Sequence, residues 1–202
     1  LFGSFVHPLI LTLIYLYIFG FVFNLRFPGE DRGADFTIYL LSGLIPWICF
    51  QEVLGKSSQV IIANASLVKQ VIFPIEILPV KGVLPAIFNQ LIMIVLLMVY
   101  AVYKMGTPPL FYALLPILVL IQALAMIGSA YILSAVGAYF RDIKDFIQIF
   151  IIVGIFSMPI FYQVEQVPKA MRIILYINPF SHLIFCYRDV LYHARIEHPY
   201  SW

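Results

Sequence analysis

The chain has 202 residues, of which 63% are hydrophobic and only 11% are charged, and its net charge is +2. A soluble domain carries about 25% charged residues, so the composition excludes a water-exposed globule and predicts an all-α polytopic membrane protein. No basic cluster indicates a nucleic-acid partner. Cys49 and Cys186 lie inside apolar runs, as is typical of buried small residues rather than of a disulfide or a metal site.

Apolar runs set the expected spans. A bilayer core about 30 Å thick needs roughly 20 apolar residues in a helix. Five runs approach or exceed that length: Phe5–Phe23, Ile38–Leu54, Val83–Tyr103, Leu110–Phe140 and Phe146–Tyr162. We therefore expect five spans in a single membrane domain that covers residues 1–202.

The loop between the second and third runs, residues 55–82, contains the amphipathic stretch NASLVKQVIF, Asn64–Phe73. At about 100° per residue its aliphatic side chains share one helix face, and Phe73 falls in the middle of the polar face. Two interpretations are open: an interfacial helix whose Phe73 enters the lipid, or a helix that docks on a cytoplasmic partner. The expected contacts in the second are Ser66, Lys69, Gln70, Phe73 and Glu76.

The turn RDIKD, residues 141–145, follows the fourth run on the same side of the membrane as the 55–82 loop. Lysines and arginines are more frequent in these two segments than in the short loops opposite, which favours a cytoplasmic position for both. Arg141 and Asp145 are four residues apart and would share a helix face. We expect Arg141, Asp142 and Asp145 at a cytoplasmic mouth.

The fifth run ends at Met158-Pro159, and a short apolar run, Ile173–Tyr187, is interrupted by Asn178-Pro179. A proline removes a backbone donor, and inside a membrane such a break is tolerated where protein or water lies beside it. We expect residues 158–192 to form a re-entrant helical hairpin that lines an outer exit. Its expected gate residues are Met158, Pro159, Asn178, Pro179 and His182. A surface-lying amphipathic pair of helices is the alternative.

Catalysis within this chain has little support. Gly-Lys-Ser at 55–57 lacks the earlier glycine of a phosphate-binding loop, and no histidine pair has the i, i+4 spacing of a helical metal site. A secondary transporter or channel stays open, but such proteins place ionisable groups within the membrane. Glu52 lies near a run end, and Asn89, Gln90 and Gln122 are not ionisable. The energy source is therefore expected outside the chain.

Three ordered stretches resemble the ABC-2 type exporter permeases, above all those for O-antigen, capsular polysaccharide and teichoic acid. They are NASLVKQVIFPIEILPV at 64–80, YFRDIKDFIQIFIIVGIFSMPIFY at 139–162, and YINPFSHLIFCYRDVLY at 176–192. Met158, between Ser157 and Pro159, departs from the family pattern by one residue.

The resemblance implies six spans in the full protein, with residues before Leu1 and after Trp202. It also implies a homodimer in the bacterial inner membrane that is bound to two separate ATP-binding subunits. ATP and Mg would be held by those subunits, and the 55–82 loop would carry the helix that couples to them. The implied substrate is a polysaccharide on undecaprenyl diphosphate, with O-antigen as the first expectation. An ABC-2 exporter of drugs or lipids is the alternative.

Aromatic residues in the first run are candidate glycan contacts, namely Tyr15, Tyr17 and Phe19. Aromatic faces suit the C–H surfaces of sugars. Aromatic side chains also gather at membrane interfaces for other reasons, and this second interpretation stays open.

Overall fold

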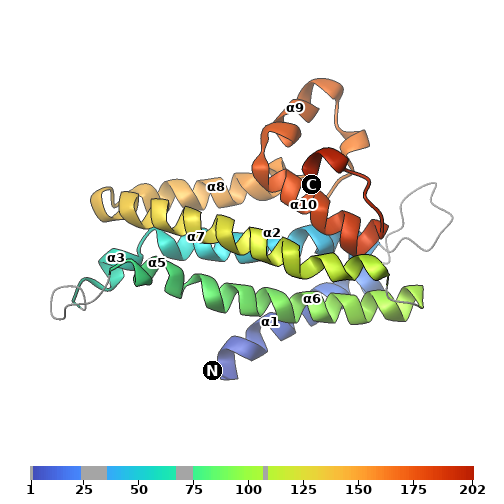
Figure 1. Cartoon of the computed structure of the whole chain (residues 1–202), viewed down its shortest axis with the longest axis horizontal. Helices are drawn as coiled ribbons and strands as arrows, with labels where there is room; N and C mark the ends of the chain where they lie inside the picture. Colours follow the sequence, from blue (N-terminus) through green and yellow to red (C-terminus); the bar gives the residue numbers. More distant parts are fainter. Residues whose placement is uncertain (1, 24–35, 67–74, 107–108) are drawn as a thin grey trace.

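The computed structural model describes residues 2–23, 36–66, 75–106 and 109–202. Within these ranges the chain is helical and contains no strand. The long helices run side by side, and a smaller pair rests against them near one end (Figure 1). An all-helical fold is expected because only segments that satisfy their own backbone hydrogen bonds can cross a bilayer singly.

Among the described residues, five long helical segments build the bundle. They are α1, Phe2–Tyr15, which continues as a π-helical segment, Leu16–Phe23; α2, Phe36–Ser57; α6, Val83–Met105; α7, Leu115–Tyr139; and α8, Ile143–Ser157.

Shorter elements join or follow the long helices. They are α3, Val60–Ala63; α5, Ile77–Lys81; a 3-10 turn, Leu110–Leu114; a 3-10 turn, Val164–Gln166; α9, Lys169–Ile177; α10, Pro179–Arg188; a π-helical turn, Asp189–His193; and a 3-10 turn, Pro199–Ser201.

Three described stretches are long and apolar enough to cross a membrane: Phe36–Ser57, Ile77–Lys104 and Leu110–Tyr139. They agree with the second, third and fourth predicted runs. The first run coincides with α1 and its π-helical continuation, of which Leu9–Val22 is a shorter apolar helix. The fifth run forms α8, whose 15 residues extend for only ~22 Å. The helices are those of a membrane protein, and a total of five spans remains a prediction.

Helix α2 is the centre of the bundle. In its most apolar window 78% of the residues are buried, against 33% for the stretch that contains α6 and 28% for the one that contains α7. It packs against α6, α7, α8 and α10. The outward faces of α6, α7 and α8 carry exposed large apolar side chains, as expected where helices face lipid.

The two ends of the bundle are distinct. At one end, which we call the Arg141 end, the turn between α7 and α8 lies near α3 and α5 (Figure 1). At the opposite end, which we call the Tyr39 end, α2 begins and α6 finishes. Gly137 lets α7 approach the backbone of Ser58 at the Arg141 end, since a Cβ there would overlap with the Ser58 carbonyl group.

Candidate functional site

The hairpin α9–α10 is built around the predicted break. Helix α9 ends before Asn178, and α10 begins with Pro179. The Asn178 side chain accepts a hydrogen bond from the backbone N–H of Phe180 at 3.0 Å. Asparagine at the N-cap followed by proline at the first helical position is a strong start signal for a helix. The predicted break at Asn178-Pro179 is therefore confirmed.

Helix α10 lies along α2 rather than across its end. Near its start, the ring of Phe180 meets that of Phe50 edge-on, with the centroids 4.5 Å apart. Near its end, Arg188 lies over Tyr39. Eleven residues separate Tyr39 from Phe50, so the start of α10 lies ~16 Å along α2 from the Tyr39 end. Gly43 permits this approach, because a Cβ there would stand 3.1 Å from Ile184.

A buried polar triangle joins α10 to two long helices. The Gln90 amide of α6 donates to Gln122 Oε1 of α7 at 2.7 Å and to the Tyr187 hydroxyl of α10 at 2.9 Å. The Tyr187 hydroxyl donates to the same Gln122 oxygen at 2.7 Å. Gln122 in turn donates to the backbone oxygen of Pro46 in α2 at 3.0 Å. Four helices are thus linked by polar bonds in an apolar setting.

Arg188 fixes the last turn of α10. Its guanidinium carbon is 3.6 Å from the centroid of the Tyr39 ring, and its Nη2 donates to the backbone oxygen of Ile160 at 2.9 Å. The Tyr39 hydroxyl donates to the backbone oxygen of Tyr162, also at 2.9 Å. The segment after α8 is therefore held to both α2 and α10.

Asp189 organises the C-terminal segment. Its side chain is fully buried. One carboxylate oxygen accepts from the backbone N–H groups of Glu197 and His198 and from Trp202 Nε1, at 3.0–3.2 Å. The other is 2.8 Å from His198 Nδ1. Burial alone would raise the pKa of Asp189, but the hydrogen bonds from His198 and Trp202 outweigh it and hold the pKa below its ordinary value of 3.8.

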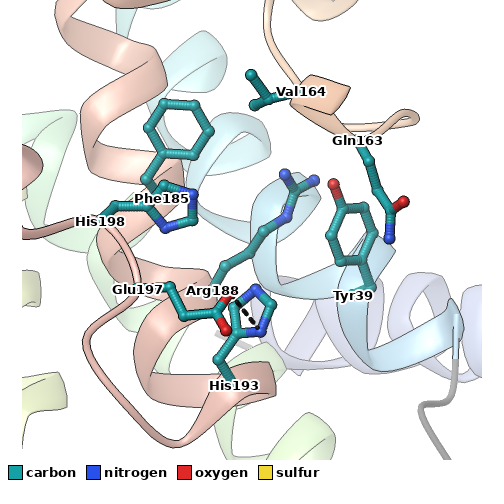
Figure 2. A pocket seen from close by; sticks show the side chains of 8 residues that line it. All are labelled: Tyr39, Gln163, Val164, Phe185, Arg188, His193, Glu197 and His198. Carbon is teal, nitrogen blue, oxygen red and sulfur yellow. Dashed lines mark ion pairs between the residues drawn. The ribbon is translucent and has the colours of Figure 1, made fainter. Parts of the chain in front are cut away.

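Next to this cluster is a cavity of about 270 Å³, which we call the Arg188 cavity (Figure 2). Its walls come from α2, from α10, from the C-terminal turns and from the segment that follows α8. The lining residues are Tyr39, Gln163, Val164, Phe185, Arg188, His193, Glu197 and His198. His193 Nδ1 lies 3.1 Å from Glu197 Oε2, and burial lowers the pKa of His193 below its ordinary 6.5, although Glu197 and Asp189 raise it.

None of the predicted gate residues lines the Arg188 cavity, and two of them, Pro179 and His182, line a second cavity beside Phe50. Met158 and Pro159 are buried where α8 ends. Asn178 caps α10, with Pro179 exposed beside it. His182 is tied through Nδ1 to the Ser201 hydroxyl at 2.9 Å and through Nε2 to the Tyr176 backbone oxygen at 2.8 Å. That these residues line a lumen remains a prediction.

At the Arg141 end, Ser66 and Glu76 are exposed, whereas Lys69, Gln70 and Phe73 lie outside the described residues. Arg141, Asp142 and Asp145 are exposed as well. Helix α8 begins only at Ile143, so Arg141 precedes it. The expectation that Arg141 and Asp145 share a helix face is therefore wrong. Asp142 is the N-cap, although its side chain makes no capping hydrogen bond.

The three candidate glycan contacts have different environments. Tyr15 and Phe19 are half-buried and pack against the core, with ring centroids 6.3 Å apart. Tyr17 is 63% exposed. Within the described residues, no group of three or more His, Cys, Asp or Glu side chains could hold a metal ion.

Sequence reasoning missed the roles of Asp189, His193, His198 and Trp202. The one available signal was the concentration of histidines, acids and tryptophan in the last fourteen residues, 189–202. Gln90 and Gln122 were noted as polar residues inside apolar runs, but nothing in the sequence paired them.

An all-helical bundle with apolar outward faces and long apolar helices defines an integral membrane protein. The chain belongs to the ABC-2 type transporter family, whose family model matches residues 2–192. Members of this family are the membrane components of transporters rather than catalysts.

Individual relatives match along most of the chain. An O-antigen export system permease protein RfbA of Klebsiella pneumoniae is 28% identical over 198 residues, which cover 98% of this chain and 74% of that protein. The RfbA permease protein of Myxococcus xanthus is 26% identical over 96% of this chain and 73% of its own length. The polysialic acid transport protein KpsM of Escherichia coli is 24% identical over 89% of this chain and 68% of its own length.

Proposed function

We propose that this chain is the membrane-spanning subunit of an ATP-driven exporter that moves a lipid-linked polysaccharide, O-antigen first among the candidates, across the bacterial inner membrane. The observation that carries the proposal is the similarity, along 89–98% of the chain, to permeases named for O-antigen export or polysialic acid transport. In this proposal the chain is a multi-pass permease that works as a homodimer and performs no catalysis itself.

ATP hydrolysis is assigned to two copies of a separate ATP-binding subunit, which would hold the ATP and Mg. The family and the scarcity of buried charge in the apolar helices support this division. The contact surface in the proposal is the 55–82 loop, with Ser66, Lys69, Gln70, Phe73 and Glu76. Both α3 and α5, which flank residues 64–76, pack against α7, so a movement of this loop has a direct route into the bundle.

The hairpin is proposed as the outer gate. Its position along α2 supports this role, because the Asn178-Pro179 break would lie within the membrane if α2 spans it. A cysteine at Ile177, which is 74% exposed, should react with a membrane-impermeant thiol reagent added from outside once Cys49 and Cys186 are replaced. Tyr200, 99% exposed, gives the matched control position. Labelling of position 200 without any labelling of position 177 would argue against a water-filled exit.

The test of the function uses the full-length protein co-expressed with its ATP-binding subunit. The subunit should co-purify with the permease, and proteoliposomes that contain both should move undecaprenyl-diphosphate-linked glycan only when ATP is supplied. Phe73→Ala should weaken co-purification, because truncation of a buried aromatic anchor costs about 2 kcal/mol or more, while Tyr200→Ala should leave it unchanged. Transport without ATP, or a permease that retains no ATP-binding subunit, would contradict the proposal.

A further inference from the structure

The Arg188 cavity is lined largely by polar side chains, and the proposed gate does not by itself explain it. Ligand pockets usually measure about 300–1,000 Å³, so a cavity of about 270 Å³ has room for one ring-sized group rather than for a length of chain. It is lined by four ionisable side chains together with an amide and two aromatic rings. In Figure 2 the guanidinium of Arg188 and both imidazoles lie around the same space.

Both imidazoles are held by carboxylates at Nδ1. His198 Nδ1 is 2.8 Å from an Asp189 oxygen, and His193 Nδ1 is 3.1 Å from a Glu197 oxygen. A carboxylate can only accept, so Nδ1 carries a proton in each ring, and Nε2 is the ring nitrogen left to bond to a ligand. His198 is also stacked on Phe185, with the ring planes 8° apart and the centroids separated by 4.5 Å, which fixes its orientation. The cavity therefore has two imidazoles whose Nδ1 atoms are held by carboxylates.

Donors and apolar walls complete the lining. The guanidinium of Arg188 and the side-chain amide of Gln163 are donors, and both residues line the cavity. Val164, Phe185 and Tyr39 contribute apolar surface. Donors, imidazoles held by carboxylates and aromatic surface in a small volume match a polyhydroxylated ring, since each hydroxyl both donates and accepts and the ring C–H groups are apolar.

Charge argues against an anion in this cavity. The Asp189 and Glu197 carboxylates offset the guanidinium groups of Arg188 and Arg195, of which Arg195 pairs with Glu197. A phosphate or diphosphate would need an excess of positive donors, whereas here two carboxylates offset the two guanidinium groups. A neutral sugar needs no such excess.

The geometry points to the Arg188 cavity as a binding subsite for a single neutral sugar residue of the exported glycan. This inference rests on the proposed function, and it names the cavity in which one unit of the proposed substrate binds. The cavity joins α2, the segment after α8, and α10, so a sugar bound there contacts the hairpin and its support together. The glycan itself can thereby stabilise one position of the hairpin.

The test is a histidine NMR titration of the full-length protein in nanodiscs, with ¹⁵N in the imidazole rings. The probes are the methyl glycosides of mannose, galactose, glucose, rhamnose and N-acetylglucosamine, each added alone, and inorganic phosphate as the anion. We expect saturable shifts of the Nε2 resonances of His193 and His198 with at least one glycoside and none with phosphate. His182 is the internal control, because both of its ring nitrogens already have partners.

Variants separate this inference from the proposed function. His193→Gln should abolish the His198 shift or raise the required glycoside concentration several-fold, and Tyr200→Ala should not. Shifts with phosphate alone would mean that the cavity binds an anion and not a sugar. The absence of a shift with every glycoside would also overturn the inference, even if the exporter moves glycan normally. Glycoside binding in a protein that exports no glycan would instead overturn the proposed function and leave the sugar site standing.

Discussion

The guanidinium of Arg188 lies 3.6 Å from the centroid of the Tyr39 ring, and this contact joins the end of the hairpin helix α10 to the start of the central helix α2. The Tyr39 hydroxyl extends the connection to the backbone of Tyr162. A single tyrosine therefore supports two elements at the Tyr39 end, through its ring and through its hydroxyl.

Tyr39 allows these two contributions to be separated. Tyr39→Phe keeps the ring under Arg188 and loses only the hydrogen bond, which costs about 1 kcal/mol. Tyr39→Leu also loses the cation–π contact, worth about 2 kcal/mol in a desolvated site. Thermal unfolding of the purified full-length protein should therefore rank wild type above Tyr39→Phe and Tyr39→Phe above Tyr39→Leu. Equal losses from both changes would mean that the ring contact contributes nothing.

The polar triangle should behave as a coupled unit. Gln122→Leu removes an acceptor shared by Gln90 and Tyr187 and leaves polar groups buried, which costs about 1–3 kcal/mol. Gln90→Leu combined with Gln122→Leu removes both amides and should cost less than the sum of the single changes. Reversible unfolding in mixed micelles measures the free energies. Strict additivity would show that the three side chains act independently.

Two glycines of α7 allow the packing at the Arg141 end to be tested, with Gly137 as the test position and Gly128 as its control. A Cβ at Gly137 would overlap with the backbone of Ser58, whereas a Cβ at Gly128 would meet nothing within 4 Å. Gly137→Ala should destabilise the protein by about 1–3 kcal/mol, and Gly128→Ala should be neutral or stabilising by up to about 1 kcal/mol. Thermal unfolding compares the two. The same effect from both substitutions would contradict the close approach of α7 to Ser58.

Titration of His193 should make stability depend on pH. Burial, with His198 and Arg188, lowers its pKa in the folded state below 6.5, although Glu197 and Asp189 oppose the shift. The unfolded chain then binds more protons in the interval below 6.5, so stability is highest above that pH and declines as the pH falls through it. Melting temperatures from about pH 8 to about pH 5 test this. His193→Gln should reduce the fall in melting temperature with falling pH. An unchanged pH dependence in that variant would mean that another group causes it.

Local signals in the sequence predicted much of the fold. Long apolar runs gave α2, α6 and α7, because length and composition alone decide whether a helix can span a bilayer. Asn178-Pro179 marked the start of α10, since capping chemistry acts between neighbouring residues. The fifth run was predicted to reach Tyr162, but α8 ends at Ser157, two residues before Pro159.

The contacts that build the candidate site are long-range. Gln90 and Gln122 are 32 positions apart, and Tyr187 is 65 positions beyond Gln122. Arg188 reaches Tyr39 and the backbone of Ile160 from separate parts of the chain. Sequence periodicity does not predict such long-range contacts, because they depend on how the helices pack against one another. The role of Asp189 in organising the C-terminal segment could therefore not be predicted from the sequence.

Depletion of this chain in the source bacterium, with the surface glycan and the cytoplasmic glycan measured together, tests the proposed export of a surface polysaccharide. The chromosomal gene is placed under inducible control, and both pools are measured during depletion. We expect surface glycan to disappear while undecaprenyl-linked glycan accumulates inside, and re-expression to reverse both changes. Unchanged surface glycan after complete depletion, with no accumulation inside, would contradict it.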